Sequence, residues 1–336
     1  QAEDGIRDHL LGLVGSEMCI RDSRTPLLER LFFLSIVSSN LDEFFMKRIG
    51  GLKQQVEAGV TGLSPDGRTP QEQIEAAYEQ VRAQVAQQRA VALGVYAELD
   101  EHGIQVRGWD DVSEADREWL RDYYVRNVFP LVTPQATDPA HPFPFISNLS
   151  LNLLVTLRYP DDDAVSLARV KVPLGIGVPR FIRVQEENIY VPLESVMAGN
   201  LDLLFPGMIV ESCEQFRITR NADTEQDEET ADDLLAMIET ELRERRFAPI
   251  VRLEVAAGMI PLHRGMLAAE LGLDEQSDVF EVEGFMAMRD LMQIIDADDS
   301  SDLHDVPHHP IDNPELPQGR NIFHIIRSAG SILLHH

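Results

Sequence analysis

The segment from Thr69 to Gly103 constrains the fold most strongly, because it carries start, periodicity and stop signals for one long helix. Thr69, Pro70 and Glu72 form a capping-box pattern with proline at the first helical position. Gly103 favours termination. Apolar residues recur between these signals for about nine turns, close to a heptad seam. They are Ile74, Tyr78, Val81, Val85, Ala92, Val95 and Leu99.

Two shorter helices are predicted before this one. Apolar residues recur at helical spacing over Leu27–Ile36. Asn40, with Glu43 three residues later, is interpreted as the N-cap of a second helix. The apolar face of that helix continues to residue 56, and glycines and a proline interrupt it over 59–67. Short loops between long amphipathic helices predict an antiparallel helical bundle at the N-terminus.

The second half of the chain mixes strands and helices. After a helix at 113–128, apolar and polar residues alternate over Leu149–Leu157, which is typical of a half-buried strand. The overall prediction is an α+β fold, with an N-terminal antiparallel helical bundle followed by a mixed α/β head. Further strands are expected at 167–172, 180–184, 208–219, 251–255 and 279–282, helices near 223–242 and at 261–271, and a polar linker at 296–318.

Charge and cysteine content argue against several classes of protein. The 57 acidic and 29 basic residues give a net charge of −28, which argues against a nucleic-acid partner. No apolar run approaches the roughly 18 residues that span a bilayer. Two cysteines cannot form a disulfide framework, so we expect a reducing compartment and a cytoplasmic location. Peripheral membrane association is left open.

Both ends of the chain are unusual. Gln1–Asp8 and Leu13–Ser23 resemble translated sequencing-library adapter, so residues 1–23 are expected to be an artefact rather than structure. A genuine disordered tail is the alternative. Asn321–Leu334 resumes an apolar pattern, and the sequence then stops at His336. Together these features predict a gene fragment.

Several short motifs follow one another in order along nearly all of Arg24–His336. They are Pro26–Leu31, Ser39–Phe45, Pro142–Leu149, Val178–Phe181, Phe216–Asp223, Val251–Val255 and Arg320–His336. In these motifs the chain resembles the ATP-dependent polyphosphate kinases that synthesise polyphosphate. The resemblance implies an N-terminal helical domain at 24–103, a head domain at 104–312 and, at 313–336, the start of a C-terminal catalytic domain of phospholipase D-like fold. The tryptophan-containing segment that usually opens the family is missing.

The resemblance also implies an activity. Members of the family reversibly transfer the terminal phosphate of ATP to a growing polyphosphate chain through a phosphohistidine, which divides one difficult transfer into two easier ones. Magnesium and basic residues neutralise the transferring oxygens. The phosphorylated histidine, the magnesium-associated arginines and most ATP contacts lie in the C-terminal domains, beyond residue 336. This chain is therefore expected to hold no catalytic residue and no metal ligand, and to be inactive alone.

The partners implied for the full-length protein are ATP, polyphosphate and further copies of itself. Asn40 is the one ATP-binding residue implied here, because the family's N-terminal domain contributes an asparagine at this motif position. An amide has both a donor and an acceptor with which to contact a base edge. The competing role is a helix cap, and the two roles are compatible. Lys47, Arg48 and Lys53 could face a phosphate, although a solvated polar face is the favoured interpretation.

Other polar clusters receive structural interpretations. The acidic run Asp223–Asp233 is interpreted as the solvated start of a helix, with a cation site as the alternative. The stretch at 302–309 has a metal-like composition, but its prolines favour a linker. Its possible ligands are Asp302, His304, Asp305, His308 and His309. No role is assigned to His141, His324, His335 or His336, and Cys213 is expected to be a small buried residue.

A non-catalytic helical scaffold or oligomerisation module is the alternative function. It is motivated by the long seam at 74–99 and by the missing catalytic residues. The negative net charge of the chain conflicts with the enzyme hypothesis at one point, because a tunnel for polyphosphate must be cationic. Leaving out residues 1–23, with their five acidic and two basic side chains, changes the net charge only from −28 to −25. The basic surface is therefore expected in the missing half.

Overall fold

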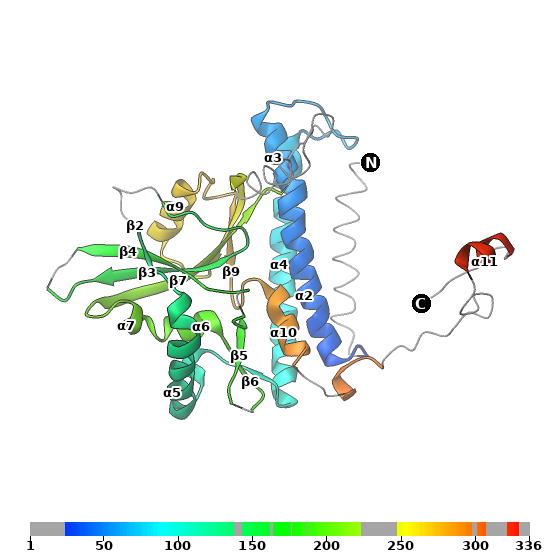
Figure 1. The fold of residues 1–336 in the computed structure, drawn as a ribbon. Coiled ribbons are helices and arrows are strands. Elements are labelled where there is room, and N and C mark those ends of the chain that lie inside the picture. The colour runs from blue at the N-terminus through cyan, green and yellow to red at the C-terminus, as the bar shows by residue number, and fades with distance from the viewer. Residues whose placement is uncertain are drawn as a thin grey trace.

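A pair of long antiparallel helices lies beside a six-stranded sheet (Figure 1). The computed structural model describes residues 24–137, 143–161, 164–175, 177–185, 187–222, 247–297, 301–306 and 321–328. None of the helices in these ranges combines the length and the apolar character that crossing a bilayer requires.

The first long helix is continuous where the sequence predicted two. α2 (Leu27–Glu43) runs directly into the π-helical turn η1 (Phe44–Ile49) and then into α3 (Gly50–Glu57). The N-cap predicted at Asn40 is therefore wrong, because Asn40 lies inside α2. No glycine or proline interrupts α2 or η1. Burial of one apolar face outweighs the weak helix propensity of the Ser-Ser-Asn stretch at 38–40.

The second long helix confirms its predicted start and stop. α4 (Pro70–Glu101) begins with a capping box. Glu72 donates its backbone N–H to the Thr69 hydroxyl at 3.3 Å, and Thr69 donates its backbone N–H to the Glu72 carboxylate at 2.8 Å. Gly103 follows with a φ of 80°, a conformation that favours glycine. α4 packs antiparallel against α2 and α3, so the predicted pairing is confirmed with two long helices rather than three.

A small three-stranded sheet lies beside the lower end of this hairpin (Figure 1). Its strand order is β1-β6-β5, and β1 and β6 are parallel. The predicted helix at 113–128 is confirmed as α5 followed by η3. The elements of this region are β1 (Gln105–Val106), η2 (Trp109–Asp111), α5 (Glu114–Tyr123), η3 (Tyr124–Val128), η4 (Phe129–Leu131), β5 (Phe181–Arg183), β6 (Ile189–Pro192), α6 (Leu193–Ala198) and α7 (Leu201–Leu204).

The large sheet has the strand order β2-β4-β3-β7-β8-β9. Its pairs are antiparallel except for β8 with β9, which are parallel. The predicted strands at 208–219, 251–255 and 279–282 are confirmed, as is the helix at 261–271. The elements are β2 (Gln135–Thr137), β3 (Leu151–Arg158), β4 (Val165–Lys171), β7 (Ile209–Arg220), β8 (Ile250–Ala256), α9 (Pro261–Glu270) and β9 (Val279–Val282).

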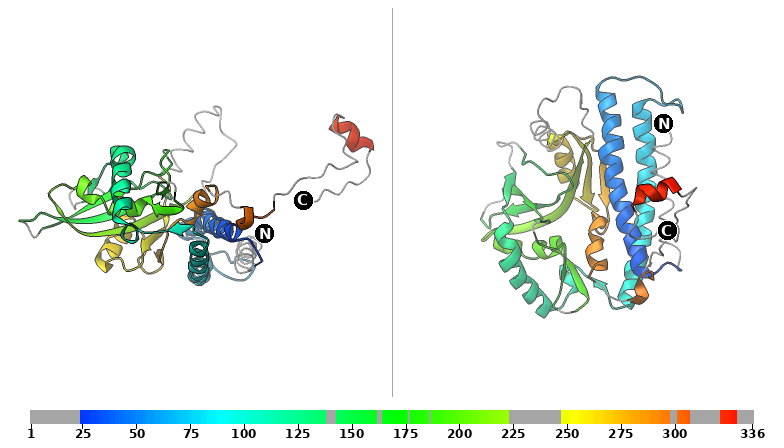
Figure 2. Two further views of the ribbon diagram at one scale, coloured as in Figure 1. Left: turned by 90° about the horizontal axis from the view of Figure 1, so that it is seen from below. Right: turned by 45° about the vertical axis from the view of Figure 1, so that its right-hand side comes forward.

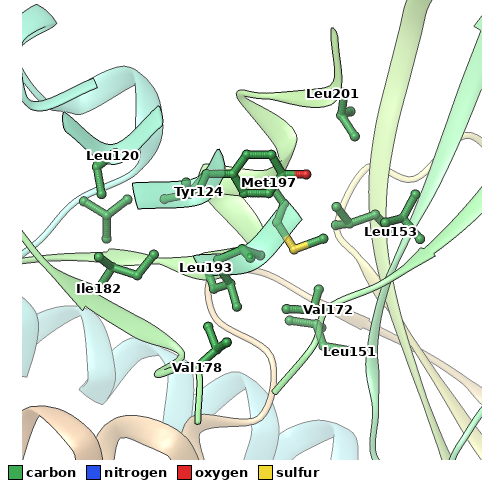
Figure 3. Close-up of a cluster of buried hydrophobic side chains, with 14 of the residues drawn as sticks. Leu120, Tyr124, Leu151, Leu153, Val172, Val178, Ile182, Leu193, Met197 and Leu201 are labelled. Carbon is green, nitrogen blue, oxygen red and sulfur yellow. The ribbon is translucent and has the colours of Figure 1, made fainter. Parts of the chain in front are cut away.

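β3 is buried on both of its faces, which corrects the prediction of a half-buried strand. Leu151 and Leu153 belong to the core on the α5 side of the sheet (Figure 3). Leu154 belongs to the core on the opposite side, where α9 packs (Figure 2). Helices therefore cover both faces at the sheet centre, and the polar side chains of Asn152 and Thr156 are buried with their apolar neighbours.

The chain returns to the hairpin after the large sheet. η6 (Met288–Leu291) and α10 (Met292–Ile295) pack on α2, and Leu291 and Ile294 share a core with Leu28 and Leu31. The remaining described elements are η7 (Ser301–Leu303) and α11 (Ile322–Ser328). The helix near 223–242 and residues 329–336 lie outside the described residues.

Candidate functional site

A buried ionic cluster joins the hairpin to the large sheet. Its members are Asp42 on α2, Arg217 on β7, and Arg252 and Glu254 on β8, named here the junction cluster. Arg217 donates to Asp42 at 3.0 Å and to Glu254 at 2.7 Å. Arg252 donates to Asp42 at 2.6 Å and to the Thr219 hydroxyl at 3.1 Å. Two carboxylates face two guanidinium groups, so the cluster is balanced in charge.

The electrostatics of the junction cluster favour the charged forms of Asp42 and Arg217. Burial would raise the pKa of the Asp42 carboxyl, but the guanidinium groups of Arg217 and Arg252 hold that pKa below its usual value. Burial acts to lower the pKa of Arg217, and the carboxylates of Glu254 and Asp42 raise it above its usual value. Because each charge is satisfied inside the protein, the cluster serves to orient α2 on the sheet rather than to bind a ligand.

A cleft of about 760 Å³ opens beside the junction cluster, between the hairpin and the edge of the sheet. Two of its cations are paired with carboxylates: Arg264 binds Glu275 and Glu281, and Arg89 binds Glu283. The Arg82 guanidinium lies 4.6 Å from the centre of the Phe280 ring. The cleft therefore combines paired charges with apolar walls. This arrangement suits the binding of a ligand rather than the transfer of a chemical group. The lining includes Ser38, Asp42, Arg82, Arg252, Phe280 and Phe285.

Asn40, the predicted ATP contact, does not line this cleft. A helix turns about 100° per residue, so Asn40 and Asp42 project from α2 roughly 160° apart. Asn40 is half-buried on the side of the helix that faces away from the junction cluster. Within the part of the chain that the structure describes, its side chain makes no hydrogen bond to another residue. The amide is therefore available to an external partner on the outer face of the hairpin.

The three cations predicted near Asn40 separate in the structure. Lys47 lies in the π-helical turn η1 that follows α2, is exposed, and pairs with Glu43 at 3.0 Å. Lys53 turns to the sheet and pairs with the mostly buried Asp278 at 2.7 Å. Arg48 is half-buried. Lys47 is thus the cation of this group that a ligand at Asn40 could reach, whereas Lys53 helps to attach α3 to the head.

The described members of the metal-like stretch at 302–309 are Asp302, His304 and Asp305. Within the described ranges, no group of three or more histidine, cysteine, aspartate or glutamate side chains is arranged to hold a metal ion. His304 faces Glu29 of α2 at 3.7 Å. Burial and the nearby Glu214 charge raise the pKa of the Cys213 thiol to about 12, so this thiol is inert at neutral pH. His141, His308, His309, His335 and His336 lie outside the described residues, as does the acidic run at 223–233.

Sequence reasoning missed the junction cluster. Arg217, Arg252 and Glu254 alternate with apolar residues along their strands, which is the pattern of polar side chains facing solvent. Two features of the sequence could have indicated the cluster. Two predicted strands carry arginines, and an acidic residue interrupts an otherwise apolar helical face. Nothing local indicates that these side chains meet.

Two family models match the chain in sequence order. The model described as the polyphosphate kinase N-terminal domain matches residues 19–107, and the polyphosphate kinase middle domain matches residues 115–294. The chain is 44% identical to a polyphosphate kinase of Synechocystis over 94% of its own length and 47% of the relative's. It is 42% identical to a polyphosphate kinase of Mycobacterium ulcerans over 94% of its own length and 44% of the relative's.

The fold has a counterpart among solved structures. The crystal structure of polyphosphate kinase from Porphyromonas gingivalis superposes with a TM-score of 0.73 at 22% identity, covering 93% of this chain and 43% of that one. At this identity the likeness concerns the fold alone. The chain spans about half the length of the curated relatives that it matches.

Proposed function

The chain belongs to the polyphosphate kinase family, and from this premise we propose that it forms the nucleotide-side portion of an enzyme that reversibly transfers the terminal phosphate of ATP to polyphosphate through a phosphohistidine. The main support is the pair of family models, which match in order over 19–107 and 115–294. Because the chain spans about half of its curated relatives, the activity and both substrates are inferred from the family.

In this proposal the chain supports the nucleotide, and the phosphate transfer takes place on residues beyond 336. Mg²⁺ is the metal that the family implies, but the described residues hold no cluster of metal-ligating side chains and do not fit it. No step of the transfer is therefore assigned to a metal held here. Arg89 and Arg264 of the cleft are paired with carboxylates, so we assign neither of them to neutralising a transferring phosphate. The chain alone is expected to make no polymer.

Asn40 is the proposed ATP contact. Its amide can donate to and accept from a base edge, and within the described residues no other side chain competes for it. The junction cluster fixes the rotation of α2, so that Asn40 is held on the outer face. Lys47 lies seven residues further along the chain, in η1, where its exposed charge can attract a phosphate.

The complete gene provides the test. The full-length enzyme with ATP and magnesium should form acid-stable polymer, and Asn40→Ala should raise the KM for ATP about tenfold, the cost of losing one or two hydrogen bonds. Ser39→Ala, a change at the adjacent half-buried position of the same helix, is the matched control and should leave the KM unchanged. Absence of polymer from the complete enzyme would contradict the proposed activity. An unchanged KM in Asn40→Ala would contradict the ligand role alone.

Homo-oligomerisation and a cytoplasmic location of the full-length protein belong to the same proposal, with peripheral membrane association as the alternative location. Light scattering on the full-length protein tests the first, and a strict monomer would contradict it. Fractionation of the source cells tests the second. Recovery of the enzyme with washed membranes, rather than with the soluble fraction, would favour the alternative.

A further inference from the structure

Two basic side chains on β4 lie in surroundings without a carboxylate. Arg169 is only 5% exposed, and its Nε donates to the Asn152 side-chain oxygen at 2.9 Å. One terminal nitrogen of Arg169 donates to the side-chain oxygen of Gln135. The Nζ of Lys171 donates to the Ser147 hydroxyl at 3.2 Å. All three acceptors are neutral, so among the described residues neither positive charge is compensated.

This arrangement differs from that of Arg180 and Arg217, which are buried more deeply still. Arg180 is paired with Glu194 at 2.6 Å, and Arg217 is paired with Glu254 at 2.7 Å. Buried charges in proteins are ordinarily paired in this way, because desolvation of an isolated ion is costly. Among the described residues no carboxylate pairs with Arg169, although the chain has 57 acidic residues, and an anion from outside would supply the missing negative charge.

The pKa shifts of Lys171 and Arg169 agree with the lack of a nearby negative charge. Burial lowers the pKa of the Lys171 ammonium, and the positive charge of Arg169 lowers it further. Burial also lowers the pKa of Arg169. Both shifts have the sign expected for cations that lack an anionic partner. A bound anion would reverse them.

A third cation borders the same loop. Arg220 donates to the backbone oxygens of Ile146 at 2.9 Å and Ala248 at 2.7 Å, and its guanidinium lies 4.9 Å from the centre of the Phe145 ring. These contacts hold the loop that carries Ser147. Its partners in the described residues are again uncharged, so Arg220 adds positive potential behind the loop.

The geometry of β4 favours an extended anion. Arg169 and Lys171 project from the same face of the strand, with their backbones about 7 Å apart. The adjoining loop contacts the long helix, because the Asn148 amide nitrogen lies 3.2 Å from the Met46 sulfur. Met46 follows Asn40 by six residues, about 9 Å along the helix axis. A linear anion along β4 would therefore run close to the helix that carries the proposed ATP contact.

We propose that Arg169, Lys171 and the Ser147 hydroxyl form a subsite for a linear phosphate polymer on β4, the strand next to the edge strand β2 of the large sheet, an inference that rests on the proposed function for the identity of the polymer. Successive phosphate groups would accept hydrogen bonds from the two cations and from the hydroxyl. The subsite binds the chain and takes no part in bond making or breaking.

Titration calorimetry of the 336-residue chain with sodium tripolyphosphate at fixed ionic strength tests the subsite. Lys171→Gln removes an exposed charge that the fold does not need, and should weaken binding about tenfold, because a charge-assisted hydrogen bond is lost. Arg126→Gln is the matched control, since it removes one positive charge from an exposed position on η3. It should change the affinity less than about twofold. Arg169→Lys, which keeps the charge but loses the fork of donors, should weaken binding by an intermediate amount.

Sodium sulfate is the comparison ligand, and its binding should not depend on Lys171. Absence of tripolyphosphate binding, or equal affinities of Lys171→Gln and Arg126→Gln, would overturn the subsite. An equal Lys171 dependence for sulfate would also overturn it, because it would indicate a site for any oxyanion. The full-length enzyme could make no polymer while the chain still bound tripolyphosphate in a Lys171-dependent way. That result would contradict the proposed function but not the subsite.

Discussion

Arg252 donates a hydrogen bond of 2.6 Å to the carboxylate of Asp42, although the two residues are 210 positions apart in the chain. The bond attaches the C-terminal end of α2 to strand β8, and the Arg252 guanidinium also lies 4.2 Å from the centre of the Phe45 ring. The hairpin is therefore fixed in rotation as well as in position. As a consequence, the orientation of the outer face of α2, which carries Asn40, is fixed relative to the sheet.

Removal of the Asp42 carboxylate should be severely destabilising. Asp42→Ala leaves Arg217 and Arg252 buried with Glu254 as the one remaining carboxylate of the cluster. Breaking a buried ion pair by removing one partner costs about 3–5 kcal/mol. Denaturant titration followed by circular dichroism measures this loss in the free energy of unfolding.

The adjacent residue provides a control for Asp42→Ala. Glu43 is exposed and pairs with Lys47 on the outer face, so Glu43→Ala should change the free energy of unfolding by less than about 1 kcal/mol. Similar losses in the two variants would mean that the junction cluster does not stabilise the fold.

The same carboxylate should make stability depend on pH in the acid range. The pKa of Asp42 in the folded state lies below its usual value of 3.8. The unfolded state then binds the proton more readily, so the contribution of Asp42 is fully present above its unfolded pKa and is lost as pH falls through its folded pKa. Denaturant titrations between about pH 2.5 and 6 should show a steeper loss in wild type than in Asp42→Asn. Parallel curves would contradict the assignment.

Local signals were sufficient for the elements that have clear ends. The capping residues Thr69 and Glu72, with Gly103 as the stop, identify α4 to within about two residues. Strand β9 coincides with the predicted range 279–282. In these cases the local preference and the tertiary packing agree, and no distant contact has to be known in advance.

Distant contacts explain what the sequence did not predict. The Asn40–Glu43 pattern is a valid capping signal, but burial of one continuous helical face against β7 and β8 overrides it. The role of Asp42 depends on arginines from two strands that lie about 175 and 210 positions away. Periodicity reports which face of an element is polar, and it cannot report which distant charge will meet it.

Loss of the capping box should cost a moderate amount of stability. Thr69→Ala removes the hydroxyl that accepts from the Glu72 backbone N–H, and should lower the free energy of unfolding by about 1 kcal/mol. Gln71→Ala, an exposed change in the same first turn, should stay within about 0.5 kcal/mol of wild type. Denaturant titration compares the two variants. Equal stabilities would indicate that the start of α4 is held by its packing and not by its cap.

Two glycines inside helices should respond to alanine in opposite directions. A Cβ at Gly50 would lie 2.1 Å from the side-chain oxygen of Asn221, so Gly50→Ala must displace this buried side chain, which directly follows β7, and should cost about 1–3 kcal/mol. A Cβ at Gly94 meets no atom within 4 Å, so Gly94→Ala should raise the free energy of unfolding by about 0.5–1 kcal/mol through helix propensity alone. Denaturant titration of both variants measures the sign of each change in the free energy of unfolding. Stabilisation by Gly50→Ala would show that α3 does not approach Asn221 this closely, and the attachment of the hairpin to β7 would then have to be looser than the structure describes.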